Sequence, residues 1–257
     1  MSKTADDFSR SFYPFLHEED KPSPGNPERI GNSPQLTEEL RFSLLEKVRE
    51  SDDVRARFFE DNKDAILAAS LAMAKSFHRG GKLLVCGNGG SATDAQHISV
   101  EFMHPITVGR LALPAICLTN DIAMVTAVSN DVSFNDVFSR QIIALGREGD
   151  MLLGISTSGN SENIVRAFDT ARRMKLTTIG YAGGDGGKMA AMLTAGTLDF
   201  CLTVPTASIH RIQESHVALY HTTWDIVHTF LEHKSPVESG VKSRESGVKS
   251  RESGVGS

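Results

Sequence analysis

Cysteine, long apolar runs and basic runs are all scarce in this sequence of 257 residues. The three cysteines lie far apart, and an odd number of separated cysteines argues against a disulfide framework and for a reducing compartment. No stretch approaches the ~20 apolar residues of a membrane span, and the N-terminus lacks the apolar core of a secretion signal. The net charge of −5, without a lysine or arginine run, argues against a nucleic-acid surface. We therefore expect a cytoplasmic protein with no membrane or nucleic-acid partner.

The two ends of the chain differ in composition from the middle. Residues 1–36 contain five prolines and mixed charge, which predicts a flexible arm without regular structure. Residues 234–257 contain the repeated unit ESGVKSR, whose single valine cannot supply the two apolar seam positions of a coiled coil. This segment is predicted to be a disordered tail. Residues 37–233 remain as one domain.

Helical and strand-like patterns alternate through that domain. A helical pattern begins at Thr37, and a second runs from Val54 to Phe77. Five short apolar runs then alternate with helical stretches, and a long helix from Ser208 to His233 ends the domain. Such alternation predicts an α/β fold, in which helices cover both faces of a parallel sheet. The expected strands are Lys82–Cys86, Pro114–Leu118, Met151–Ile155, Thr177–Tyr181 and Phe200–Val204.

A turn rich in hydroxyl groups, GISTSGNS at residues 154–161, follows the third expected strand and opens a helix. Free backbone N–H groups and the positive dipole end of a helix attract anions, and hydroxyl groups add donors. Because the turn contains no lysine or arginine, it would hold a phosphate monoester mainly through neutral donors. The alternative is an ordinary serine-rich helix cap. The candidate phosphate-binding residues are Ser156, Thr157, Ser158 and Ser161.

A glycine-rich turn, GNGGS at residues 87–91, follows the first expected strand. Its glycines allow a ligand to approach the backbone, and its serine is a candidate helix cap. The turn is neither a dinucleotide fingerprint nor a nucleotide-binding P-loop. Ligands of parallel α/β sheets bind beyond the carboxyl ends of the strands, where both turns are expected. The candidate substrate-binding residues here are Asn88, Gly89, Gly90 and Ser91, with Asn130 and Asp131 as a candidate polar loop.

His97 and Glu101 lie four residues apart on the helix that the glycine-rich turn opens, and therefore share one face. A histidine nitrogen and a carboxylate oxygen at that spacing suit a divalent ion such as zinc. The alternative is an ordinary surface pair.

The long final helix offers two further candidate ligands. Gln213 and His221 project about 40° either side of Val217, which lies on an apolar stripe, whereas His216 projects about 100° away. Burial of polar side chains on such a face costs free energy unless hydrogen bonds or a metal satisfy them. A histidine held by a core hydrogen bond is the alternative to a four-ligand metal site.

Six motifs in order resemble one known family. They are GNGGSATDAQH, LPAICLT, VSNDVSFNDVFSRQIIALGREGD, GISTSGNS, GGDGGKM and HRIQESH, and they resemble the phosphoheptose isomerase branch of the SIS (sugar isomerase) domain family from about Leu40 to His233. The resemblance implies a five-stranded, flavodoxin-like parallel sheet and a homotetramer with active sites between subunits. It also implies interconversion of sedoheptulose 7-phosphate and D-glycero-D-manno-heptose 7-phosphate.

The resemblance also implies a role for each candidate residue. The Zn²⁺ ligands would be His97, Glu101, Gln213 and His221, and the serine turn would hold the phosphate. The sugar site would be lined by Asn88, Gly89, Gly90, Asn130 and Asp131. Isomerisation through an enediol(ate) needs a base and a means of stabilising oxyanion charge. We expect Glu101 to remove the carbon-bound proton and His221 to move protons on oxygen, with zinc polarising the substrate oxygens.

Two alternatives to this function stay open. One is an isomerase of another phosphorylated sugar, such as an octose or octulose 8-phosphate. The other is a non-catalytic SIS-domain regulator that binds a protein. A relative of that second kind lacks the glutamate and the final histidine, whereas this chain has both Glu101 and His221. Their presence favours the enzyme.

Overall fold

The computed structural model describes residue 31 and residues 33–233. The predicted arm therefore falls almost wholly outside the described residues, and the predicted tail does so completely. The chain divides into two compact units, one up to Arg49 and one from Glu50 onward. In the first unit, the described part is essentially the beginning of helix α2 (Pro34–His78). The second unit contains the sheet and all the other described helices.

The second unit is built on a sheet of five parallel strands, as predicted, in the order β2-β1-β3-β4-β5. This is the flavodoxin-like order, whose switch point lies between β1 and β3. Every residue of β1 and of β3 is buried, which explains why the strands read as continuous apolar runs. The strands are β1 (Leu83–Gly87), β2 (Ala115–Cys117), β3 (Met151–Ser156), β4 (Thr177–Gly183) and β5 (Phe200–Val204).

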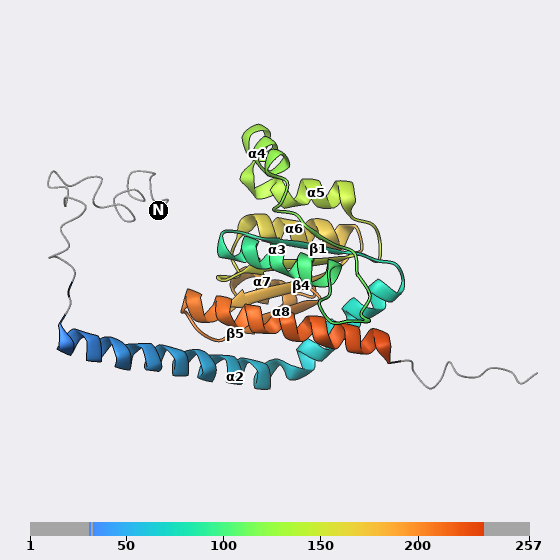
Figure 1. Cartoon of the computed structure of the whole chain (residues 1–257). Coiled ribbons are helices and arrows are strands. Elements are labelled where there is room, and N and C mark those ends of the chain that lie inside the picture. The colour runs from blue at the N-terminus through green and yellow to red at the C-terminus, as the bar shows by residue number, and fades with distance from the viewer. Residues whose placement is uncertain (1–30, 32, 234–257) are drawn as a thin grey trace, which may run out of the picture. The chain divides into compact units, whose positions relative to one another are not determined.

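Helices cover both faces of the sheet, and each face has its own apolar core (Figure 1). Successive strand residues point to opposite faces, so Leu83 and Val85 enter one core whereas Leu84 and Cys86 enter the other. Residues of α2, α3 and α8 fill the first core, and residues of α5, α6 and α7 fill the second. The remaining helices are α3 (Gly90–Met103), α4 (Ile122–Asp131), η3 (Phe134–Asp136), α5 (Val137–Leu145), α6 (Glu162–Arg173), α7 (Gly187–Thr194) and α8 (Ile209–Glu232).

Helix α2 is continuous where the sequence predicted two helices. The stretch RESDD at residues 49–53 is polar but contains no glycine or proline, so nothing in it breaks the helix. Leu40, Leu44 and Val48, which the first pattern predicted to share one apolar helix face, do lie in the helix. Each of them is more than half exposed.

The buried face of α8 includes most of the predicted stripe, since Tyr220, Trp224 and Val227 are buried, but it extends further to one side. Val217, on the predicted apolar stripe, is 36% exposed, whereas His216 is fully buried and lies 3.0 Å from the Ala182 carbonyl oxygen. Because α8 packs against both the sheet and α3, its inward face is wider than a single projected stripe. Gln213 and His221 lie at the margin of this face.

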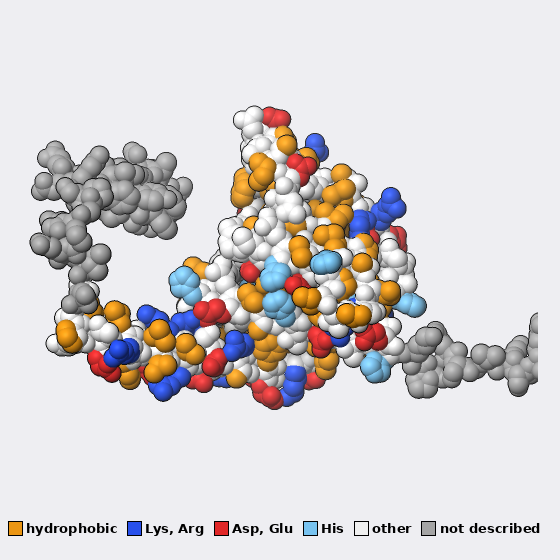
Figure 2. Space-filling view, viewed as in Figure 1, with side chains coloured by type: hydrophobic (Ala, Val, Ile, Leu, Met, Phe, Trp, Pro, Cys, Tyr) orange, Lys and Arg blue, Asp and Glu red, His pale blue; other side chains and the backbone are white. Residues whose placement is uncertain are grey.

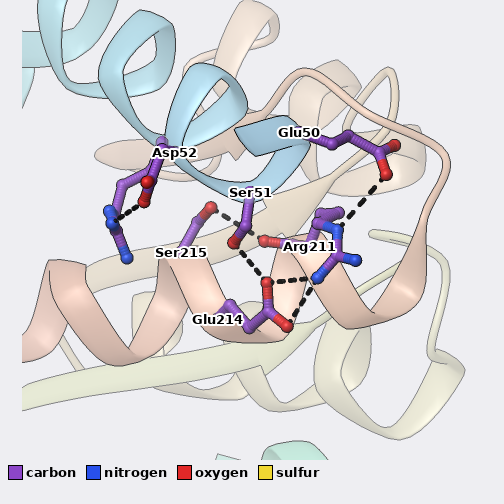
Figure 3. A network of polar contacts seen from close by, with 7 residues as sticks. Glu50, Ser51, Asp52, Arg211, Glu214 and Ser215 are labelled. Carbon is purple, nitrogen blue, oxygen red and sulfur yellow. Dashed lines mark hydrogen bonds and ion pairs between the residues drawn. The ribbon is translucent and has the colours of Figure 1, made fainter. Parts of the chain in front are cut away.

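A polar network fixes the first turns of α8 against α2 (Figure 3). The Arg211 guanidinium donates to both carboxylate oxygens of Glu214 at 2.7 Å and to Glu50 at 3.5 Å. Ser51 donates a further hydrogen bond to Glu214. Exposed ion pairs contribute little, but the Arg211 side chain is only 12% exposed, which strengthens this one. The turn that carries Gln213 is thereby held in place.

The three cysteines are free, as predicted. Burial raises the pKa of the Cys86 thiol far above its ordinary value and also raises the pKa of Cys201, so both thiols are poor nucleophiles. Among the described helices, none combines the length and apolar character that crossing a membrane requires.

Candidate active site

The side chains of His97, Glu101 and His221 converge between α3 and α8. One candidate ligand atom from each lies within 4.8 Å of the others. His97 Nε2 lies 3.0 Å from Glu101 Oε1, and the rings of His97 and His221 meet edge to face with centroids 5.1 Å apart. Histidine side chains gather on the face formed by these two helices, beside acidic side chains (Figure 2). Three of the four residues that were predicted as metal ligands therefore lie close together in the structure.

The donor set of this cluster fits zinc. Two imidazole nitrogens and one carboxylate oxygen are ligands that zinc accepts in catalytic sites, where a further position stays open. Bonds of ~2.1 Å at tetrahedral angles place ligand atoms about 3.4 Å apart. The spacing of up to 4.8 Å between candidate atoms therefore requires a contraction of at most about 1.4 Å, which is within the reach of small side-chain rotations.

Gln213 packs against the start of α3. A Cβ atom at Gly90 would lie 3.1 Å from Gln213 Cδ and nearer still to Nε2, so the glycine leaves the space that this amide occupies. Gly90 is seven residues before His97, a rise of roughly 10 Å along α3. Gln213 is eight residues before His221 on α8, which runs alongside. The amide thus lies against the start of α3, toward the carboxyl end of the sheet and about two helical turns from His97, and its place among the ligands stays a prediction.

Buried polar groups lie directly behind the cluster. The Tyr220 hydroxyl lies 2.8 Å from His97 Nδ1, and Trp224 Nε1 donates to the Glu101 carbonyl oxygen at 2.8 Å. Burial raises the pKa of Asp94 to about 6, an effect that His97 partly opposes. Burial also raises the pKa of Tyr220 to about 12, with smaller contributions from the charges of Asp94 and Glu101. Sequence reasoning missed Asp94, because which face of α3 is buried depends on where α8 packs.

The serine turn leads from β3 into α6 as predicted. Ser156 is the buried last residue of β3, and Ser161 is the N-cap of α6 without a side-chain capping bond. The hydroxyl groups of Ser156 and Ser161 lie 2.8 Å apart, so both face the same point above the helix start. Ser158 Oγ instead accepts from the Asn160 N–H at 3.2 Å. The turn thus offers hydroxyl donors and the first N–H groups of α6 to an anion.

A lysine that sequence reasoning missed lies beside this turn. The Lys188 N–H donates to Asn160 Oδ1 at 3.0 Å, and its ammonium group donates to Glu162 Oε2 at 2.7 Å. Gly159 has a φ of 64°, and a Cβ there would lie 2.5 Å from the Gly186 carbonyl carbon. The loop before α7 therefore packs tightly on the serine turn. A hollow of about 290 Å³ opens here, lined by Thr157, Ser158, Asn160, Gly183, Gly184, Asp185, Thr206, Ala207, Ile209 and Ile212.

The two predicted turns meet at the switch point of the sheet. Asn88 and Asn163 exchange two side-chain hydrogen bonds of 2.9 Å, which join the glycine-rich turn to the first turn of α6. β1 and β3 are adjacent, so the loops that follow them share one edge of the sheet. Gly89 is the N-cap of α3, with a φ of 55°, and Ser91 is a buried residue within that helix, so the expected Ser91 cap is wrong.

Asn130 and Asp131 lie in the last turn of α4, not in a loop as expected. Both are exposed, and Asn130 Nδ2 donates to Asp131 Oδ1 at 2.8 Å. Helix α4 packs on η3 and α5. The apolar pattern before Asn130 predicted the helix but not how far it continues, since asparagine and aspartate often end helices. Their part in the sugar site stays a prediction.

Comparison with known proteins points to one family. Residues 48–183 match the SIS domain. The chain is 42% identical over 196 residues to the phosphoheptose isomerase of Nitratidesulfovibrio vulgaris (strain Miyazaki F), a match that covers 76% of this chain and 92% of that protein. It is 44% identical over 184 residues to the phosphoheptose isomerase of a Roseiflexus species, covering 72% of this chain and 91% of that protein.

A solved structure agrees. The phosphoheptose isomerase of Neisseria gonorrhoeae is 39% identical and superimposes with a TM-score of 0.69, over 74% of this chain and 99% of that one. Each of these matches spans nearly the whole relative. The chain therefore belongs to the phosphoheptose isomerase family of SIS-domain proteins, which are sugar-phosphate aldose–ketose isomerases.

Proposed function

We propose that this chain interconverts sedoheptulose 7-phosphate and D-glycero-D-manno-heptose 7-phosphate through an enediol(ate), with Zn²⁺ bound at His97, Glu101, Gln213 and His221. One observation carries the proposal. His97 and Glu101 on α3 converge with His221 on α8, in a chain about 40% identical to phosphoheptose isomerases over most of its length. Surface histidine–carboxylate pairs are common, but a second histidine brought from a distant helix is not a feature of such pairs.

The serine turn has the role of phosphate anchor. Ser156 and Ser161 present paired hydroxyl groups at the start of α6, and Thr157 and Ser158 line the adjoining hollow. Lys188 adds a positive charge whose partner Glu162 is partly exposed. Binding energy from the phosphate, remote from the reacting carbons, positions C1 and C2 of the sugar for proton transfer. Asn88, Gly89, Gly90 and Ser91, with Asn130 and Asp131, are proposed to contact the sugar.

Two side chains of the cluster carry the proton transfers. A carboxylate has two oxygens, so Glu101 can keep one toward His97 while the other removes the proton from carbon. His221 moves the proton between the oxygens on C1 and C2. Zinc, when bound, supplies Lewis-acid polarisation of those oxygens. The Trp224 bond to the Glu101 carbonyl holds that turn of α3 in place during the transfer.

We further propose that the chain works as a homotetramer with its sites between subunits. The loop that follows the Glu101 helix exposes apolar side chains, of which Ile106 is 87% and Val108 fully exposed. Exposed apolar residues next to a catalytic cluster are typical of a surface that a partner covers. Multi-angle light scattering should give about four times the chain mass of 27.9 kDa. A monomer of full activity would refute sites shared between subunits.

We propose a cytoplasmic location on the basis of the cysteines. All three are free, and Cys86 and Cys117 are buried. The partly exposed Cys201 is the more informative one, because a free, accessible thiol suits a reducing compartment.

A coupled assay with zinc tests the function. Wild type should convert sedoheptulose 7-phosphate, and Glu101→Gln should lower kcat by roughly 10²–10⁴-fold because the carbon-bound proton loses its base. Glu148→Gln is the matched control, since Glu148 is an exposed glutamate paired with Lys175 away from the site. An octulose 8-phosphate in the same assay tests the other sugar. If Glu101→Gln matches Glu148→Gln, the assigned base is wrong; if neither sugar reacts, the assigned reaction is wrong.

A further inference from the structure

The two ring nitrogens of His97 face different surroundings. Nε2 faces Glu101, on the side where His221 converges, whereas Nδ1 is engaged by the buried hydroxyl of Tyr220 at 2.8 Å. A nitrogen already engaged by an interior hydroxyl is not free to hold an ion. Nε2 is therefore the atom that His97 presents to a metal.

Metal binding at Nε2 determines where the imidazole proton must lie. A ligating nitrogen carries no proton, so in the neutral ring Nδ1 must carry it. Nδ1–H can donate only if the Tyr220 oxygen accepts. Tyr220 is 3% exposed, and its own O–H proton then needs another acceptor inside the protein.

Asp94 is the available acceptor. It lies one turn before His97 on the buried face of α3 and is 8% exposed. Its Oδ2 is buried and has no hydrogen-bond partner among the described residues. Asp94 is three residues before His97, so the two side chains are neighbours on one face of α3, and the Tyr220 hydroxyl contacts His97 there. A rotation of the Asp94 carboxylate, or one bridging water, links it to Tyr220.

We propose that Tyr220 and Asp94 form a relay behind His97, in which Nδ1–H donates to the Tyr220 oxygen and Tyr220 donates to Asp94. The relay rests on the proposed metal site and deepens it. It holds the imidazole in the tautomer that leaves Nε2 free, and it places a carboxylate charge behind the ligand. Tyr220 and Asp94 are thus positioning residues and touch neither substrate nor ion.

The relay also explains why a carboxylate is buried without a partner. A buried acid that makes no hydrogen bond costs free energy, and the structure around Asp94 offers no compensation until the His97 proton moves to Nδ1. Two other buried histidines of α8, His216 and His228, lack such support, because each has one ring nitrogen without a partner among the described residues. The support is specific to the histidine at the cluster.

Zinc affinity tests the relay apart from activity. Full-length chain is depleted of metal and titrated with zinc against a chromophoric chelator. Tyr220→Phe should weaken zinc binding by roughly 10–100-fold, the usual effect of losing an outer-shell partner. Tyr181→Phe is the matched control, because Tyr181 is also a buried tyrosine, and its hydroxyl donates to Thr223 and not to a residue of the cluster. Its affinity should stay within about twofold of wild type.

A second variant separates the two members of the relay. Asp94→Asn should weaken zinc binding. The double variant with Tyr220→Phe should bind zinc no more weakly than Tyr220→Phe alone, because the two groups act in series.

Additive losses of zinc affinity in the double variant would overturn the relay. Equal affinity of Tyr220→Phe and Tyr181→Phe would overturn the role of Tyr220. A wild type that binds no zinc would refute the metal site itself, whereas a wild type that binds while Tyr220→Phe is unchanged refutes the relay alone. Circular dichroism and thermal unfolding check that each variant is folded.

Discussion

The variant Gly90→Ala tests whether Gln213 in its observed position is needed for zinc binding, while the stability of the fold stays nearly unchanged. The new methyl group would lie 3.1 Å from Gln213 Cδ and nearer still to Nε2, whereas carbon atoms need about 3.5–4.0 Å. The amide must therefore retreat by roughly 1 Å or more. Gly90 has a helical backbone at the first position of α3, so alanine itself causes no strain there. The free energy of unfolding should change by no more than about 0.5 kcal/mol, since alanine favours a helix over glycine.

The consequences for zinc differ from those for folding. If Gln213 is a ligand, Gly90→Ala should weaken zinc binding by about tenfold or more, a loss of ~1.4 kcal/mol. Gln213→Ala should do the same. The double variant should be no weaker than Gln213→Ala alone, because both changes remove one contact. Chelator competition gives the affinities, and urea unfolding of the metal-free chains gives the stabilities.

Two results would refute this reasoning. Wild-type zinc affinity in Gly90→Ala would show that the amide does not need its observed place. Additive losses in the double variant would show that Gly90 acts on the ion by a route other than Gln213.

Three further predictions concern the anchor and the buried acid. Gly159→Ala should destabilise the fold by roughly 1–3 kcal/mol in urea unfolding, because φ is 64° and the new Cβ meets the Gly186 carbonyl; a wild-type midpoint would contradict the tight packing. Ser156→Ala with Ser161→Ala should raise KM and the inhibition constant of inorganic phosphate far more than it lowers kcat, and an unchanged phosphate constant would remove the anchor role. Asp94 has its pKa raised from 3.8 to about 6, so its ionised form opposes folding above pH 6 and this penalty is lost as pH falls toward 3.8. Asp94→Asn should therefore stabilise the metal-free chain at pH 7.5 by about 1–2 kcal/mol after allowance for contact with water, less at pH 5, and an equal effect at both values would contradict the shift.

The sheet and the pairing of His97 with Glu101 followed from local pattern. Continuous apolar runs predict strands buried on both faces, and the spacing of His97 and Glu101 predicts a shared helix face. These are properties of one element at a time. The accuracy of these two predictions therefore did not depend on knowing how the helices and strands pack together.

Errors such as the break expected in α2 and the expected Ser91 cap concern local boundaries, whereas the larger omissions depend on packing between elements. The extension of the buried face of α8 to His216, with Val217 partly exposed, follows from the contact of α8 with both the sheet and α3. The buried Asp94 behind the cluster follows from the same contact. Lys188 reaches the serine turn from a helix that begins 26 residues after Ser161, at Gly187, because β4 returns the chain to the same edge. No periodicity within a single segment carries that information.

Proton NMR of the reaction in D₂O tests the central claim most directly, namely that Glu101 takes the carbon-bound proton of a ketoheptose phosphate. Wild-type chain with zinc and sedoheptulose 7-phosphate should form the aldose and incorporate deuterium at C2 of the aldose or at C1 of the recovered ketose. Glu101→Gln should show neither product nor exchange, while Glu148→Gln matches wild type. Deuterium exchange at the wild-type rate in Glu101→Gln would contradict the account.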